Sequence, residues 1–131
     1  DVRALKIALN AKQGPGRLFL VSDAMALVGS DSNTFLLNGR VVRRDRTGYC
    51  PKLTLEDGTL AGSDTNMALS VRFLTEWAGV PLEDALRRAT ADPADFLGVG
   101  HLRGRFVPGA CADYVHLSET GTVLAVSRGE A

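Results

Sequence analysis

Arg17-Leu18-Phe19-Leu20-Val21-Ser22-Asp23 is the stretch that decides the fold. Its run of apolar residues follows the turn-forming Gly14-Pro15-Gly16 and ends on two polar side chains, a pattern typical of a strand buried on both faces. Residues 2–11 carry apolar side chains at helical spacing, which predicts a short helix with Asp1 as its cap. A helix, a glycine-rich turn and a buried strand make an α/β unit, so we expect an α/β fold.

Composition limits what the chain can do. Its 131 residues suit about one domain, and 15 basic side chains balance 15 acidic ones. Without a basic excess the chain lacks the charge that nucleic-acid binding requires, so no nucleic-acid partner is expected. The apolar runs are too short for a membrane-spanning helix, and no signal peptide is expected. The two cysteines, Cys50 and Cys111, form no CxxC pair, which favours reduced thiols in a cytosolic protein.

Turn signals further along predict a small antiparallel excursion at about residues 34–60. Asn38-Gly39 supplies the positive φ angles of a type I′ hairpin turn, and Asp57-Gly58 marks a second turn. The remaining elements are expected as helices at 65–78, 81–89 and about 92–97, followed by a hairpin of strands at 112–117 and 122–126. The expected helix caps are Ser63 or Asp64 for the first of these helices and Asp92 for the last.

Asp23 is the first candidate for chemistry. In parallel α/β folds the carboxyl ends of strands carry the reactive groups, and Asp23 ends the expected strand. A carboxylate there can take a proton from a metal-bound water and later give it to a leaving group. Position alone favours a simpler interpretation, in which Asp23 only caps the turn that follows the strand.

Other polar patterns are interpreted more simply. His101 and His116 stand at no ligand spacing, so both are expected to be ordinary surface or half-buried histidines. The glycines between residues 98 and 104 follow a helix and indicate a loop, not a dinucleotide site. The cluster Arg43-Arg44-Asp45-Arg46 is interpreted as a solvated strand edge guarded by charge.

Three segments together resemble a known family. They are Leu20-Val21-Ser22-Asp23-Ala24 with Gly29, then Gly58–Ser63 continuing to Met67, and then Leu102–Val115 with its Pro108-Gly109 and Ala112-Asp113 pairs. The third segment alone indicates the wider amidohydrolase superfamily. In this order and at these separations the three resemble the C-terminal part of the N-acetylglucosamine-6-phosphate deacetylases, over essentially the whole chain.

The resemblance implies a fold. Residues 1–100 would be the C-terminal part of a (β/α)8 TIM-type barrel that carries the hairpin excursion, with the stretch ending at Ser22 as its eighth strand. Residues 101–131 would return to a small β-sandwich domain, whose other strands belong to an earlier part of a complete family member. The chain would then be a fragment.

The resemblance also implies a function, the removal of acetyl from N-acetylglucosamine 6-phosphate to give glucosamine 6-phosphate and acetate. Asp23 matches the family's catalytic aspartate, which activates the metal-bound water and protonates the departing amine. Leu60, Ala61 and Gly62 match the loop whose backbone contacts the sugar. The Asp23 side chain should then point into a cavity beside the barrel rim.

The family's other requirements lie outside these residues. A complete member binds a divalent metal, zinc or iron, through a glutamate and two histidines on earlier strands, so no metal ligand is assigned here and the chain alone is expected to be inactive. The resemblance further implies a cytoplasmic homodimer with a small amino-sugar phosphate as substrate. The sequence departs from the family pattern at Asp64-Thr65-Asn66, where Asp64 is expected to cap the helix that follows.

Two alternatives stay open at this point. One is another amide hydrolase of the same superfamily, against which the Gly58–Ser63 segment argues. The other is an α/β interaction domain without chemistry, which would fold on its own. A fragment of a barrel would instead leave apolar strand and helix faces uncovered.

Overall fold

The structure is a computed structural model that describes residues 1–47 and 51–129. Helices and strands are both present, as the expected α/β class requires. The chain divides into two compact units, which are described separately: Asp1–Val21 with Met67–Ala131, and Ser22–Asn66. Cys50 lies outside the described residues, whereas Cys111 is a buried free thiol.

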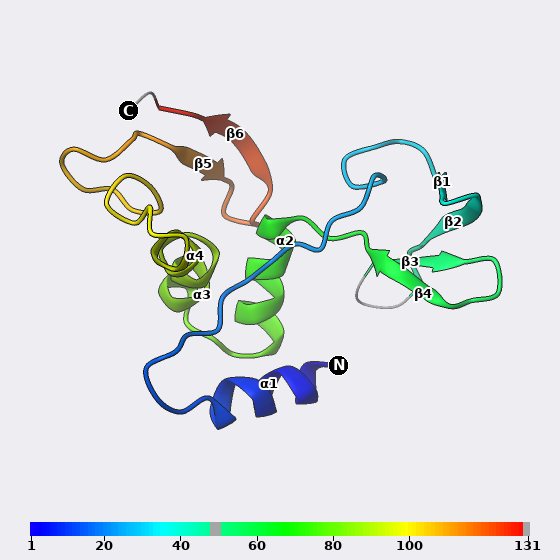
Figure 1. Ribbon diagram of the computed structural model, residues 1–131, viewed down its shortest axis with the longest axis horizontal. Helices are drawn as coiled ribbons and strands as arrows, with labels where there is room; N and C mark the ends of the chain where they lie inside the picture. The colour runs from blue at the N-terminus through cyan, green and yellow to red at the C-terminus, as the bar shows by residue number, and fades with distance from the viewer. Residues whose placement is uncertain (48–50, 130–131) are drawn as a thin grey trace. The chain divides into compact units, whose positions relative to one another are not determined.

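Helices α1 (Val2–Ala11), α2 (Met67–Arg72) and α3 (Leu82–Ala89) form the core of the first unit. Figure 1 shows α2 and α3 between α1 and the hairpin of β5 (Tyr114–Leu117) and β6 (Val123–Ser127). One cluster of buried side chains consists of Val71, Leu74 and Ala85, and the apolar side of α1 packs on it through Leu5 and Leu9. The predicted cap of α1 is confirmed, because the Asp1 side chain accepts a hydrogen bond from the Arg3 amide at 2.8 Å.

The prediction of a buried strand at residues 17–23 is wrong for this structure. No strand is assigned to these residues, and Val21 is 67% exposed. The segment instead lies extended along the end of α3, where the Leu20 amide donates to the Arg88 carbonyl at 2.9 Å and the Arg88 side chain donates to the Leu18 carbonyl at 2.5 Å. A parallel strand exists only beside hydrogen-bonded neighbours, and none of the described residues supplies them here.

The predicted helices are present, with different starts. α2 begins at Met67, so Asn66 flanks it and neither Ser63 nor Asp64 is in the cap position. Its continuation, η1 (Phe73–Trp77), is a π-helical turn in which the Ala78 amide donates to the Phe73 carbonyl. α4 (Ala91–Phe96) begins one residue before Asp92 and is flanked by Thr90, so the predicted Asp92 cap is also wrong.

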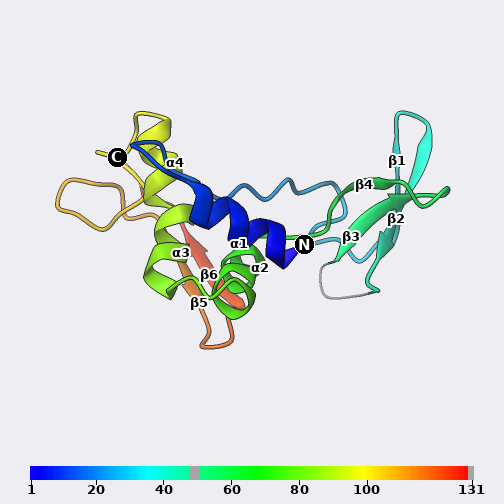
Figure 2. The same cartoon turned by 90° about the horizontal axis from the view of Figure 1, so that it is seen from below.

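The second unit is a four-stranded antiparallel sheet in the order β1-β2-β3-β4, seen from another side in Figure 2. Its strands are β1 (Thr34–Leu37), β2 (Arg40–Asp45), β3 (Lys52–Leu55) and β4 (Leu60–Ser63). The antiparallel excursion is confirmed, and Asn38 and Gly39 adopt the predicted positive φ angles of 50° and 78°. Leu27, Val42 and Leu53 form its core.

Candidate functional site

Asp23 has an unusual backbone conformation. Its φ is 48°, and Asn38 is the other non-glycine residue with positive φ in the described part of the chain. A type I′ turn explains Asn38, whereas Asp23 lies in no hairpin. Left-handed backbone at a non-glycine residue costs on the order of 1–3 kcal/mol and is concentrated at functional sites. The Ser22 hydroxyl accepts a hydrogen bond from the Ala24 amide at 3.3 Å and so closes the turn that presents Asp23.

The Asp23 side chain is exposed, and within residues 1–47 and 51–129 it has no hydrogen bond or ion pair. The expectation that it points into a cavity is therefore not met in this structure. The physical reason is that the strands and loops of a barrel rim, which would wall such a cavity, are not among the described residues. What the structure does define is the immediate surrounding of Asp23 in the second unit.

The structure brings Asp23 and Gly62 together. Ala24 and Ser63 form a parallel bridge, so the residues before them lie on adjacent stretches of chain. A Cβ atom added at Gly62 would lie 2.1 Å from the Met25 sulfur, which shows how closely the two segments pack. A larger residue at position 62 would have to displace the Met25 side chain.

Leu60, Ala61 and Gly62 lie in strand β4, whereas the family resemblance implied a loop at these residues. β4 is one of the two edge strands of the sheet, so its outer side carries backbone N–H and C=O groups next to the Asp23 turn. The turn before β4 is fixed by Asp57, whose carboxylate accepts a hydrogen bond from the Thr59 amide at 2.9 Å. This bond holds the pKa of the Asp57 carboxyl below its ordinary value of 3.8.

Sequence reasoning missed the role of Arg44. Three of the four residues of the charged cluster lie on β2, but the Arg44 side chain is only 3% exposed, so its assignment to a solvated edge is wrong. Arg43, its neighbour, fits that assignment, because it pairs with Glu56 on the surface at 2.9 Å. The alternation of a strand was the available signal: Arg44 is two residues from Val42, which is fully buried, and shares its face of the sheet.

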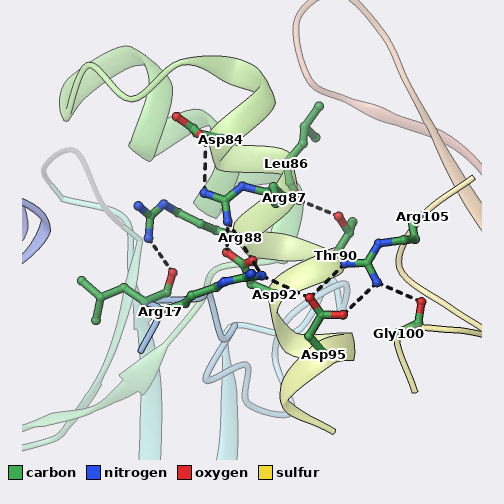
Figure 3. Close-up of polar contacts among 11 residues, drawn as sticks. Arg17, Asp84, Leu86, Arg87, Arg88, Thr90, Asp92, Asp95, Gly100 and Arg105 are labelled. Carbon is green, nitrogen blue, oxygen red and sulfur yellow. Dashed lines mark hydrogen bonds and ion pairs between the residues drawn. The ribbon is translucent and has the colours of Figure 1, made fainter. Parts of the chain in front are cut away.

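A second charged cluster lies in the first unit and is shown in Figure 3. The Asp92 side chain is fully buried, and Nη1 atoms of Arg17 and Arg87 each lie 2.8 Å from its Oδ1 atom. Asp95, on the same helix, accepts hydrogen bonds from Arg105, which together with the charges of Arg105 and Arg17 lower the pKa of its carboxyl. The cluster links Arg17 to α4 through Asp92, and Asp92 to α3 through Arg87. It includes none of the predicted site residues.

The described residues do not fit a metal ion. Among them no three histidine, cysteine, aspartate or glutamate side chains come together as ligands, so we derive no step through a metal. His101 and His116 are exposed, as expected. No helix in the described ranges has the length and apolar character needed to cross a membrane.

Comparison with known proteins identifies the class. The chain is 38% identical over 115 residues to an N-acetylgalactosamine-6-phosphate deacetylase of Shewanella sp. (strain ANA-3), covering 87% of the chain and 28% of that protein. It is 36% identical over 124 residues to the N-acetylglucosamine-6-phosphate deacetylase of Caenorhabditis elegans, covering 93% and 28%. No protein-family model matches the chain.

Solved structures agree. The N-acetylglucosamine-6-phosphate deacetylase of Pasteurella multocida matches with a TM-score of 0.85 at 29% identity, over 98% of this chain and 32% of that one. An aspartate-to-alanine mutant of the Mycobacterium smegmatis enzyme, in complex with N-acetyl-D-glucosamine-6-phosphate, matches with a TM-score of 0.74 at 30% identity, over 95% of this chain and 32% of that one.

The chain is thus related to deacetylases of amino-sugar 6-phosphates. More particularly, the predicted resemblance to N-acetylglucosamine-6-phosphate deacetylases is confirmed in both sequence and structure. The chain spans about 30% of the length of the relatives that it matches.

Proposed function

We propose that this chain supplies the Asp23 side of a deacetylase active site, which hydrolyses N-acetylglucosamine 6-phosphate to glucosamine 6-phosphate and acetate. The observation that carries the proposal is the left-handed backbone of Asp23 beside Gly62. The family resemblance supports it, because it matches Asp23 with the family's catalytic aspartate. The names of the curated relatives support the reaction. The substrate complex of the M. smegmatis mutant supports the substrate class.

In this mechanism Asp23 moves one proton. Its carboxylate accepts a proton from the water whose oxygen attacks the acetyl carbonyl carbon. It then donates that proton to the amine nitrogen as the carbon–nitrogen bond breaks, which releases acetate and the amino sugar. The exposed position of Asp23 suits both transfers, because no partner in the described residues competes for its oxygens. The outer edge of β4, from Leu60 to Gly62, offers backbone groups that would orient the sugar.

The rest of the proposal depends on the family resemblance alone. We propose that the complete enzyme, meaning the polypeptide with the further parts that its relatives have, is a TIM-type barrel with a small β-sandwich domain. It would bind zinc or iron through residues outside this chain and act as a cytoplasmic homodimer.

A second substrate is favoured by one specific observation. The Shewanella relative at 38% identity is named for N-acetylgalactosamine 6-phosphate. The two substrates differ in the configuration of one ring hydroxyl, at C4, and share the acetamide on which Asp23 would act. The same mechanism therefore serves both, and only the sugar contacts would separate them.

Acetate release from both sugar phosphates by the metal-loaded complete enzyme tests the proposal. We expect Asp23→Asn to lower kcat about 10²–10⁴-fold, the usual contribution of a positioned acid or base, with little change in KM. Asparagine is the sharpest replacement, because it tolerates the left-handed backbone. Asp31→Asn is the matched control, since Asp31 is also exposed. A metal-loaded wild-type enzyme that releases acetate from neither compound would refute the function, and full activity in Asp23→Asn would refute the role of Asp23.

A further inference from the structure

Arg44 lies on β2, an inner strand of the sheet in the second unit, and its side chain is buried. Its Nη1 atom donates to the carbonyls of Ser30 at 3.1 Å and Ser32 at 2.9 Å, and its Nη2 atom donates to the carbonyl of Leu27. These three carbonyls belong to the turn that follows Asp23. An arginine presents five N–H donors in a fixed planar fork, so this one side chain fixes the turn at three points.

The same guanidinium also reaches the chain beyond β4. Nη2 donates to Asp64 Oδ1 at 3.3 Å, and Nε lies 2.7 Å from Asp64 Oδ2 in an ion pair without hydrogen-bond geometry. The Arg44 and Asp64 side chains are 3% and 8% exposed. The bridge between Ala24 and Ser63 joins two segments of the chain. Arg44 contacts both of them, the first through the carbonyls that follow Ala24 and the second through Asp64, which follows Ser63.

We propose that Arg44 is a positioning residue, which holds the Asp23 turn and the Gly62 strand at the separation that deacetylation requires. This inference rests on the proposed function and deepens it. Arg44 touches neither Asp23 nor Gly62, and acts through Leu27, the two serine carbonyls and Asp64. A buried charge left without its partners is costly, so separating Arg44 from Asp64 is unfavourable. The Arg44–Asp64 pair therefore keeps the Asp23 turn and the Gly62 strand in place.

Lysine at position 44 keeps the charge and loses the planar fork. In the complete, metal-loaded enzyme we expect Arg44→Lys to lower kcat by about 10–100-fold with KM changed less than threefold, since small misplacements of reacting groups have effects of this size. Asp64→Asn keeps the three carbonyl bonds and should lower kcat less. Arg40→Lys is the matched control on the same strand, because Arg40 pairs with Asp57 at the surface and its side chain is 61% exposed.

Amide hydrogen exchange separates positioning from general stability. The Val28 and Ser30 amides bond to the Met25 and Leu27 carbonyls inside the turn. We expect both to exchange at least tenfold faster in Arg44→Lys, while the amides of α2 and α3 stay as in wild type. Should Arg44→Lys fail to fold, Asp64→Asn gives the same readouts with a smaller change.

The kcat and the amide exchange of Arg44→Lys test the inference separately. Wild-type kcat in a folded Arg44→Lys protein, or a loss of activity that only follows the loss of folded protein, would overturn the inference and leave the proposed function standing. If the wild-type enzyme releases no acetate, the proposed function fails. Exchange at Val28 and Ser30 then decides whether Arg44 positions the turn, and unchanged exchange would refute that role as well.

Discussion

Asp92→Asn should destabilise the first unit by about 3 kcal/mol. The Asp92 side chain is fully buried, and its two oxygens make three contacts of 2.8 Å with guanidinium nitrogens of Arg17 and Arg87 (Figure 3). Hydrogen bonds to charged groups contribute roughly 1.5–3 kcal/mol and neutral ones about 1 kcal/mol. The difference between the two, about 1 kcal/mol for each of the three contacts, is the stability that we expect the protein to lose when the charge of Asp92 is removed.

The size of this loss depends on the partners. The side chains of Arg17 and Arg87 are 53% and 41% exposed, so water can solvate both when the carboxylate is gone. This places the expected cost at the lower end of the roughly 3–5 kcal/mol that breaking a fully buried pair costs. Asp95→Asn is the matched control on the same helix, because the Asp95 side chain is 38% exposed and solvent-exposed ion pairs contribute much less to stability than buried ones.

Urea unfolding followed by circular dichroism measures both variants. Native-state exchange of the Ala94 amide, which bonds to the Thr90 carbonyl at 3.2 Å, reports on α4 itself. A free energy of unfolding for Asp92→Asn within about 0.5 kcal/mol of wild type would show that the buried pair contributes little net stability. An equal loss in Asp95→Asn would show that burial is not what separates the two aspartates.

Two further changes test the close contacts and charges described above. Gly62→Ala should displace the Met25 side chain and lower both the free energy of unfolding and kcat. Adding Met25→Ala should restore most of both losses in the same activity and unfolding assays. A double variant that performs no better than Gly62→Ala would contradict this packing. The pKa of Asp95 is lowered in the folded chain, chiefly by the hydrogen bonds from Arg105, so its stabilising contribution is complete above the ordinary value of 3.8 and is lost as the pH falls below it. Arg105→Gln should raise that pKa towards 3.8 in a carboxyl NMR titration, with Arg103→Gln as the control that leaves it unchanged, and an unmoved Asp95 titration in Arg105→Gln would refute the assignment.

Local signals were sufficient for much of the fold. Asn38-Gly39 predicted its turn because few residues tolerate two positive φ angles in succession. The spacing of apolar residues predicted α1 and α2, and Asp1 was the predicted cap of α1. These predictions needed only neighbours within a few residues.

Contacts between distant residues explain the errors. Asp92 was predicted to be a helix cap because it begins a helical pattern. Its side chain instead pairs with Arg17, which is 75 residues away in the sequence. Arg44 looks like surface charge, but its contacts lie 12 to 20 residues away. The buried strand expected at 17–23 needs strands beside it that the described residues do not supply. Asp23 became a candidate through its place at the end of the expected strand and through the family resemblance, whereas its left-handed backbone leaves no mark in the sequence.

The bridge between Ala24 and Ser63 closes the second unit at its base, while the Asn38-Gly39 turn lies at its free end. The length of the chain can therefore vary at the Asn38-Gly39 turn but not next to the bridge. Residues inserted at the tip would lengthen a surface hairpin at a small entropic cost, whereas one residue inserted between Asp23 and Leu27 would shift the three carbonyls that accept from the Arg44 guanidinium. Natural variation and engineered tags should therefore collect at the tip, with the base kept constant in length.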